Sequence, residues 1–181
     1  MAGLPAQKGI MIMIQEIYFA AGCFWGTQRL FQSITGVVET SCGYANGRPE
    51  IQPDYKRVCQ GDTDYRETVL VRYDPGQVTL PQLLKAYFHV VDPTLQNRQG
   101  NDIGTQYQAG IYYTEEASGE TVRSYAEAEA RNYPVFAVEV CPLSRFVPAE
   151  DYHQDYLIKN PTGYCHIPRM EFDTIDRFIR S

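Results

Sequence analysis

The sequence predicts an α+β protein: a two-layer α/β sandwich with a ferredoxin-like βαββαβ core, long loops and an irregular C-terminal tail. Short runs rich in apolar and β-branched residues alternate with longer segments of helical spacing, in the order β-α-β-β-α-β. The helical segments are apolar along one side, as expected for helices that pack on a sheet. Because strand crossovers are right-handed, both helices should cover the same face of that sheet.

Three strands and one helix are predicted in the first half of the chain. Residues 14–20 form a mostly apolar, strand-like run, and residues 24–34 follow at helical spacing. Residues 37–44 alternate and are rich in β-branched side chains, which predicts the second strand. Residues 45–66 are rich in turn formers and predict a loop of a length that is usually functional. Residues 67–73 predict the third strand.

The second helix has the clearest signal in the chain. Residues 79–82 (Thr-Leu-Pro-Gln) fit a capping box with proline in the first turn. The apolar residues that follow share one helical face; they are Leu80, Leu83, Leu84, Tyr87, Phe88 and Val91. We interpret this stripe as core and assign it no chemistry.

The rest of the chain predicts further elements and a tail. Residues 1–13 lack a core pattern and are expected to be a flexible lead-in, so 14–181 would form one domain without repeats or linkers. The further elements are a polar loop over 96–106, a strand at about 107–113, a polar outer helix over 115–132 begun by Thr114, a strand over 136–140 and a last helix over 148–159. An irregular tail, carrying Cys165 and His166, would follow.

Composition disfavours several classes of partner. The net charge of −6 and the absence of a basic run disfavour nucleic acid and anionic membranes. No apolar run is long enough to span a bilayer. The five cysteines form no C-x-x-C pair, and neither they nor the three histidines have metal-ligand spacing, so we expect no metal and no cofactor. An odd number of scattered cysteines favours a reducing cytoplasm.

Residues 22–26 (Gly-Cys-Phe-Trp-Gly) lie where the first strand gives way to the first helix. Cys23 would face unpaired N–H groups at the helix N-terminus, which favour its thiolate. The flanking glycines would leave room for another molecule, and Phe24 and Trp25 would form an apolar wall. An unreactive buried cysteine remains the alternative. A lipoprotein cleavage site is disfavoured because Gln15 and Glu16 interrupt the preceding apolar run.

Glu67 is the carboxylate that the strand pattern singles out. It begins a strand face that it shares with Val69, Val71 and Tyr73. Partial desolvation there would raise its pKa and let it hold a proton near neutral pH. From exposure statistics alone, a solvated glutamate at a strand end is the more common outcome.

A series of motifs resembles the A-type peptide methionine sulfoxide reductases. The resemblance runs in order over essentially residues 14–166; it includes residues 22–26, 54–59, 61–63, 73–75, 99–107, 152–154 and 160–165. It implies an enzyme that reduces methionine-S-sulfoxide, free or in proteins, to methionine. Residues 14–181 would then be one catalytic domain that repairs oxidised proteins as a monomer.

The resemblance also implies roles for individual residues. Cys23 would be the nucleophile and Glu67 the proton donor to the sulfoxide oxygen. Tyr55 and Tyr107 would donate hydrogen bonds to that oxygen. The substrate methyl group would lie against Phe24 and Trp25. Asp102 matches an aspartate beside the substrate, and a loop-capping aspartate is almost as well supported.

Regeneration would use a second cysteine. Attack leaves Cys23 as a sulfenic acid, and Cys165 matches the family's first resolving cysteine, in a tail over about 160–181. The resulting Cys23–Cys165 disulfide would be reduced by thioredoxin. His166 could assist thiolate formation at Cys165, although an exposed tail histidine is the simpler interpretation. Cys42, Cys59 and Cys141 look structural, and Cys42 is the one to test as an alternative resolver.

One departure and two rival functions remain. Many family members carry a histidine two residues before the glutamate, where this chain has Tyr65, so the tuning of Glu67 and the shape of the pocket rim are left open.

A cysteine hydrolase would use Cys23 with His153. A ferredoxin-like binding module would leave Cys23 inert and use the aromatic residues as a platform.

Overall fold

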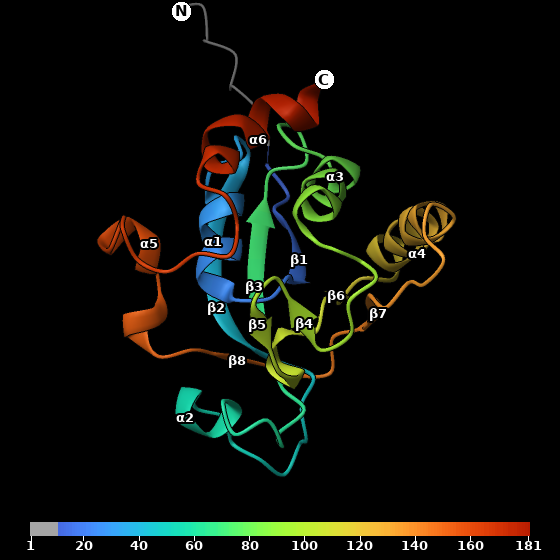
Figure 1. The fold of residues 1–181 in the computed structure, drawn as a ribbon. Coiled ribbons are helices and arrows are strands. Elements are labelled where there is room, and N and C mark those ends of the chain that lie inside the picture. Colours follow the sequence, from blue (N-terminus) through green and yellow to red (C-terminus); the bar gives the residue numbers. More distant parts are fainter. Residues whose placement is uncertain (1–10) are drawn as a thin grey trace, which may run out of the picture.

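The protein is built on a six-stranded mixed sheet, seen in the computed structural model, which describes residues 11–181 (Figure 1). The strand order is β7-β6-β1-β3-β2-β8, and neighbours are antiparallel except for the parallel pair β6 and β7. The strands are β1 (Gln15–Ala20), β2 (Val37–Ala45), β3 (Arg66–Tyr73), β6 (Gly110–Tyr113), β7 (Glu139–Pro142) and β8 (Phe146–Pro148). The predicted mixed α/β architecture is confirmed, and β8 is an edge strand that the sequence did not predict.

Four helices contribute to the core on one face of this sheet. They are α1 (Phe24–Gln32), α3 (Leu80–Val90), α4 (Glu116–Ala130) and α6 (Met170–Arg180). One buried cluster joins Ile17 and Val71 of the sheet to Leu83 of α3 and Ile175 of α6. In Figure 1, α6 crosses the ends of α1 and α3, while α4 lies beside β6 and β7. This single helical layer gives the two-layer sandwich.

The opposite face of the sheet has a smaller cluster. Tyr18, Leu70 and Tyr112 are buried there, with Phe146 of β8 packed against them. Leu70 therefore faces away from Val71, as the alternation in the sequence predicted. The same alternation puts Glu67 on the helix-covered face, near the start of α1.

The capping box of α3 forms as predicted. The Thr79 side chain accepts a hydrogen bond from the Gln82 backbone N–H at 3.3 Å, and Gln82 Oε1 accepts one from the Thr79 N–H at 3.0 Å. Two of the four unpaired N–H groups at the helix start are thereby satisfied. The sequence could predict this cap because both hydrogen bonds join residues only three positions apart.

Both predicted long loops contain short elements. Residues 45–66 include α2 (Tyr55–Val58), capped by Asp54, which accepts a hydrogen bond from the Arg57 N–H at 2.8 Å. Residues 96–106 include the two-stranded sheet of β4 (Arg98–Gln99) and β5 (Asp102–Ile103). A 3₁₀ turn, η1 (Thr105–Tyr107), follows, so β6 begins at Gly110 rather than at the predicted Tyr107.

The predicted helix over 148–159 is wrong as one element. The segment forms η2 (Asp151–His153) and α5 (Tyr156–Lys159), with Asp155 between them in the left-handed region at φ 56°. The Asp155 N–H donates to Gln28 Oε1 at 2.9 Å, and its carboxylate accepts from Gln32 at 2.6 Å. Contacts with α1 therefore break the helix, and such long-range contacts are invisible to periodicity.

Other elements also begin at residues different from those predicted. Helix α4 has Glu115 at its N-cap rather than Thr114, without a side-chain cap, and β7 begins at Glu139 rather than at residue 136. The tail is irregular only between α5 and α6, since α6 was not predicted and buries Ile175 and Ile179. The lead-in expected over 1–13 falls mostly on residues 1–10, outside the described residues. Among residues 11–181, no helix is both long and apolar enough to cross a membrane.

Candidate active site

Cys23 occupies the N-cap of α1, shortly after the end of β1. Gly22 makes this turn with φ at +83°, a conformation that glycine adopts without strain. The Cys23 side chain is buried, with 7% of its surface exposed. Burial raises the pKa of the thiol well above its ordinary value, the charge of Glu67 adds to this, and the N–H groups of Trp25 and Gly26 only partly oppose it. The expected resting thiolate is therefore wrong, because desolvation outweighs the helix N-terminus.

Glu67 lies against the same helix start. Its Oε2 accepts a hydrogen bond from the Phe24 N–H at 3.0 Å, and 2% of its surface is exposed. Burial raises the pKa of the carboxyl to about 8, the bond from Phe24 opposes this shift, and the charge of Asp102 adds to it. The solvated strand-end glutamate is excluded, and Glu67 is mostly protonated at neutral pH.

Two phenols lie close to the thiol and the carboxyl. Tyr55 is the first residue of α2, and Tyr107 is the last of η1. The pKa of Tyr55 is raised by burial, then by Cys59 and Glu67. The pKa of Tyr107 is raised by burial, then by Glu67 and Cys23. Both phenols therefore keep their protons and can donate hydrogen bonds.

Trp25 forms an aromatic wall with a residue that the sequence analysis missed. Its ring stacks on Tyr156 with centroids 3.7 Å apart and planes inclined by 12°. Trp25 stays partly exposed, whereas Phe24 is 1% exposed and packs against Tyr44. Nothing in the sequence distinguished Tyr156 from the other tyrosines, because α5 was predicted as part of a longer helix.

His153 supports this wall from behind. It is fully buried, and its ring lies 5.1 Å from that of Phe24 and 4.4 Å from that of Tyr55. Its Nδ1 accepts the Trp25 Nε1–H at 3.0 Å, so the remaining proton is on Nε2. The pKa of the imidazole is lowered by burial. With its lone pair engaged by Trp25, His153 cannot act as the base of a Cys23–His153 hydrolase.

Asp102 projects from β5 toward the same place. Its Oδ1 accepts a hydrogen bond from the Tyr164 hydroxyl at 2.9 Å, while Oδ2 is buried without a partner among the described residues. Its charge contributes to the raised pKa values of Cys23 and Glu67. Because Asp102 makes this contact instead of bonding its own loop's backbone, the loop-capping interpretation loses support.

Cys165 rests on the first turn of α1. A methyl group built at Gly26 would come within 2.9 Å of Cys165 Sγ. The room left by the glycine is therefore filled by the chain's own tail. All five cysteines are free thiols. Cys42 is fully buried in the middle of β2 and donates to Gln28 Oε1 at 3.2 Å, which makes it a poor candidate for a moving resolver.

Tyr65 is turned away from the pocket rim. It is fully buried, and its ring lies against Gly47 where a side chain would clash. Its hydroxyl donates to the Ile51 carbonyl at 3.2 Å and accepts from Arg145 at 2.9 Å. Tyr65 thus holds the loop that carries α2.

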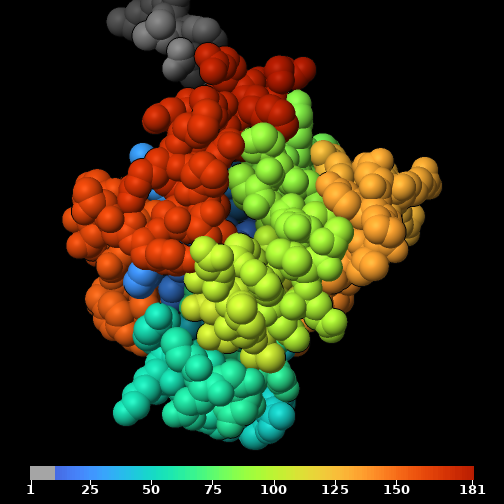
Figure 2. All heavy atoms as spheres, in the orientation of Figure 1, coloured from blue at the N-terminus to red at the C-terminus, as the bar shows by residue number. Residues whose placement is uncertain are grey.

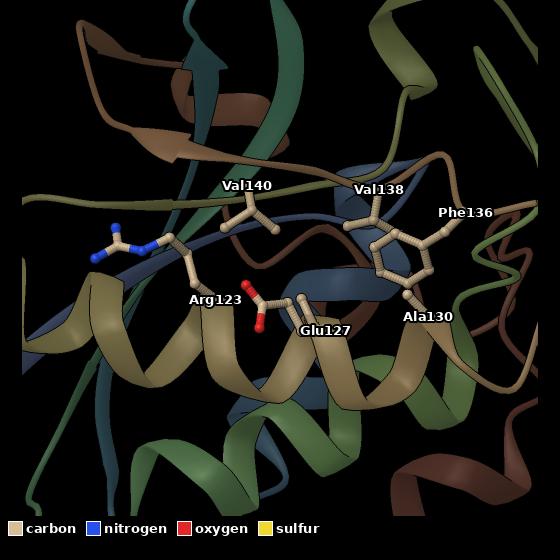
Figure 3. A pocket seen from close by; sticks show the side chains of 7 residues that line it. Arg123, Glu127, Ala130, Phe136, Val138 and Val140 are labelled. Carbon is tan, nitrogen blue, oxygen red and sulfur yellow. The ribbon is translucent and has the colours of Figure 1, made fainter.

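Three distant segments surround the start of α1. In Figure 2 the blue N-terminal part is visible only as small areas, some of them where the teal, yellow-green and orange-red segments approach one another. These segments carry Tyr55, Tyr107 and Cys165 respectively. A separate hollow between α4 and the segment that leads into β7 is lined mainly by apolar side chains such as Phe136, and the Glu127 carboxylate points into it (Figure 3). That hollow lacks a nucleophile.

A buried thiol, a neutral carboxyl, two phenols and a second thiol on the C-terminal tail define a cysteine-based redox enzyme. The model of the family described as peptide methionine sulfoxide reductase matches residues 15–178. The chain therefore belongs to the peptide methionine sulfoxide reductase family and is an oxidoreductase that reduces methionine sulfoxide.

Individual relatives agree with this assignment. The peptide methionine sulfoxide reductase MsrA of Clostridium acetobutylicum is 48% identical over 157 residues, which cover 86% of this chain and 96% of that protein. Reduced Mxr1 from Saccharomyces cerevisiae has a TM-score of 0.80 at 37% identity, covering 87% of this chain and 93% of that chain. Mxr1 in complex with Trx2 is similar in fold, with a TM-score of 0.56 at 23% identity, covering 82% and 91%.

Proposed function

We propose that Cys23 attacks the sulfur of methionine-S-sulfoxide while Glu67 protonates its oxygen. The observation that carries this proposal is the hydrogen bond from the Phe24 N–H to Glu67 Oε2 at 3.0 Å. Because Phe24 follows Cys23 directly, this bond holds the neutral carboxyl close to the nucleophile. Glu67 gives its proton to the oxygen and takes the proton that Cys23 releases. A thiol and a sulfoxide thereby become a sulfenic acid and a thioether, and Glu67 ends unchanged.

The surroundings of the site support selection of the S epimer. The phenols of Tyr55 and Tyr107 would donate hydrogen bonds to the sulfoxide oxygen, as in an oxyanion hole. The methyl group would lie against the partly exposed ring of Trp25, beside the buried ring of Phe24. Asp102 keeps one unpaired carboxylate oxygen, among the described residues, for a polar group of the substrate. Fixing the oxygen, the methyl group and, through Asp102, the direction of the remaining substrate chain leaves one configuration at the sulfur atom.

Cys165 would resolve the sulfenic acid. Its thiol attacks the Cys23 sulfur, water leaves, and the Cys23–Cys165 disulfide passes to thioredoxin by thiol–disulfide exchange. The position of Cys165 on Gly26 supports this pairing, and the complex of the related Mxr1 with Trx2 supports the reductant.

We further propose the setting in which the enzyme works. Residues 14–181 would form a single catalytic domain whose tail, about 160–181, carries the resolving cysteine. Free thiols at all five cysteines support a reducing cytoplasm, where the enzyme would repair oxidised proteins as a monomer without nucleic acid. Light scattering of the full chain tests the monomer, and an oxidised peptide compared with the free amino acid tests the substrate range.

One assay tests the central chemistry. Wild-type protein with dithiothreitol should reduce methionine-S-sulfoxide and leave the R epimer unchanged. Cys23→Ser should abolish the reaction, whereas Cys141→Ser, which removes a partly exposed thiol of β7, should keep it. Full activity of Cys23→Ser would show that the nucleophile is assigned wrongly.

A further inference from the structure

The imidazole of His166 carries a buried lone pair that no described group uses. Its Nε2 lies 2.8 Å from the backbone oxygen of Ala21. A carbonyl oxygen only accepts hydrogen bonds, so Nε2 must carry the proton of the neutral ring. Nδ1 is then the acceptor nitrogen, and it is buried without a partner among residues 11–181. Burial lowers the pKa of His166, which keeps the ring neutral.

This lone pair and the Cys165 sulfur both border Gly26. A methyl group built at Gly26 would come within 2.9 Å of Cys165 Sγ and within 3.4 Å of His166 Nδ1, so both atoms border the same small space. A methyl at Gly22 would come within 3.2 Å of His166 Nε2. The two glycines that flank Cys23 therefore admit both the thiol and the imidazole of the tail.

The thiol of Cys165 needs a base before it can attack. It donates to the Ile167 carbonyl at 3.2 Å, and a backbone carbonyl cannot take its proton. Burial raises the pKa of this thiol, the Ile167 backbone and Arg169 lower it, and Asp102 raises it. The charge of Asp102 also raises the pKa of His166, against the larger effect of burial. To reach Nδ1, which borders the same glycine, the Cys165 thiol must give up its hydrogen bond to the Ile167 carbonyl.

We propose that His166 Nδ1 accepts the proton of Cys165 as this thiol attacks the sulfenic acid of Cys23. The Cys165–Cys23 bond forms as the S–O bond of Cys23 breaks, and the leaving hydroxide takes the proton from His166 and departs as water. Cys23 is reduced from sulfenic acid to disulfide, Cys165 is oxidised, and His166 ends neutral. The proposal deepens the proposed function and rests on it.

The test separates a base from a purely structural histidine. In His166→Gln the side-chain amide can still donate to the Ala21 carbonyl, but no base remains; His166→Asn is the second variant. Each is mixed with one equivalent of methionine-S-sulfoxide without reductant, and the methionine released and the thiols lost are followed by rapid quenching. Methionine should appear at the wild-type rate, while disulfide formation at pH 7 should slow by about 10- to 100-fold.

The pH dependence of disulfide formation distinguishes a base from a purely structural histidine. Without a base the reaction needs the free thiolate, so the disulfide rate of both variants should rise with pH and approach that of the wild type in alkaline solution. An unchanged rate at pH 7, or an equal loss at every pH, would overturn the role of His166. Failure of the wild-type protein to release methionine would instead overturn the proposed function.

Discussion

The Phe24 backbone N–H donates a hydrogen bond of 3.0 Å to Glu67 Oε2, which ties β3 to the first residue of α1. The acid is thereby held at a fixed distance from Cys23, the residue before Phe24. The same bond stabilises the charged carboxylate, yet burial outweighs it and the pKa remains raised to about 8. Position and protonation of Glu67 are therefore set by two separate causes.

The substitution Glu67→Gln separates these two causes. The amide oxygen of the new side chain can still accept the Phe24 N–H, but the side chain cannot give up a proton to the substrate. We expect kcat/KM for methionine-S-sulfoxide to fall by about 10²- to 10⁴-fold, as for loss of a general acid. A dithiothreitol-driven assay measures this, with circular dichroism to verify the fold. A loss of less than about tenfold would argue against proton donation by Glu67.

Catalysis should depend on the proton of Glu67. Since the folded pKa is raised to about 8, the acid is present below that pH and is lost as the pH rises through it. We expect methionine release to fall above about pH 8. The measurement uses Cys165→Ser in a single turnover, because this variant isolates the first step. A rate that stays level well into alkaline solution would contradict the prediction.

Stability should also depend on this carboxyl. Between the ordinary pKa of 4.5 and the folded value of about 8, the native state binds one proton that the unfolded state has lost. Stability therefore falls as the pH rises through this window and then levels off. At about 1.4 kcal/mol per pKa unit, the loss relative to Glu67→Gln is a few kcal/mol. Urea unfolding of both proteins across this pH window measures it, and parallel curves would refute it.

Gly26→Ala should affect resolution more than the first step. The new methyl would meet Cys165 Sγ at 2.9 Å, so the tail sulfur must move. The helix itself should gain about 0.5–1 kcal/mol, because alanine favours a helix more than glycine does. We expect methionine release to persist while disulfide formation slows several-fold, as followed by thiol titration. Equal slowing of both steps would instead indicate a disturbed nucleophile.

Local signals in the sequence predicted the early elements well. The alternation in β3 put Glu67 on the core face, and residues 79–82 predicted the cap of α3, because both patterns depend on neighbours within a few residues. The C-terminal third was harder to predict. Asp155 breaks the expected helix through contacts with α1, which lies more than 120 residues earlier.

The residues of the candidate site also fall into those that the sequence indicated and those that only long-range contacts revealed. Cys23 at a strand–helix junction was readable from the sequence, and the resemblance pointed to Glu67, Tyr55, Tyr107 and Cys165, whose chemical roles remain predictions. Tyr156 was missed because its stacking on Trp25 joins two segments that have no shared pattern. His166 was interpreted as an exposed tail residue, yet its Nδ1 is buried.

The sequence by itself determined the order of the elements from β1 to α3, the place of Cys23 at a helix start and the family resemblance. Only the tertiary structure decided the charge states of Cys23 and Glu67. It buries both side chains, so the Cys23 thiol keeps its proton at rest instead of forming the expected thiolate, and the Glu67 carboxyl keeps its proton as well. The reason is physical. A helix N-terminus is a local feature that the sequence reveals, whereas desolvation depends on which distant segments close over the site.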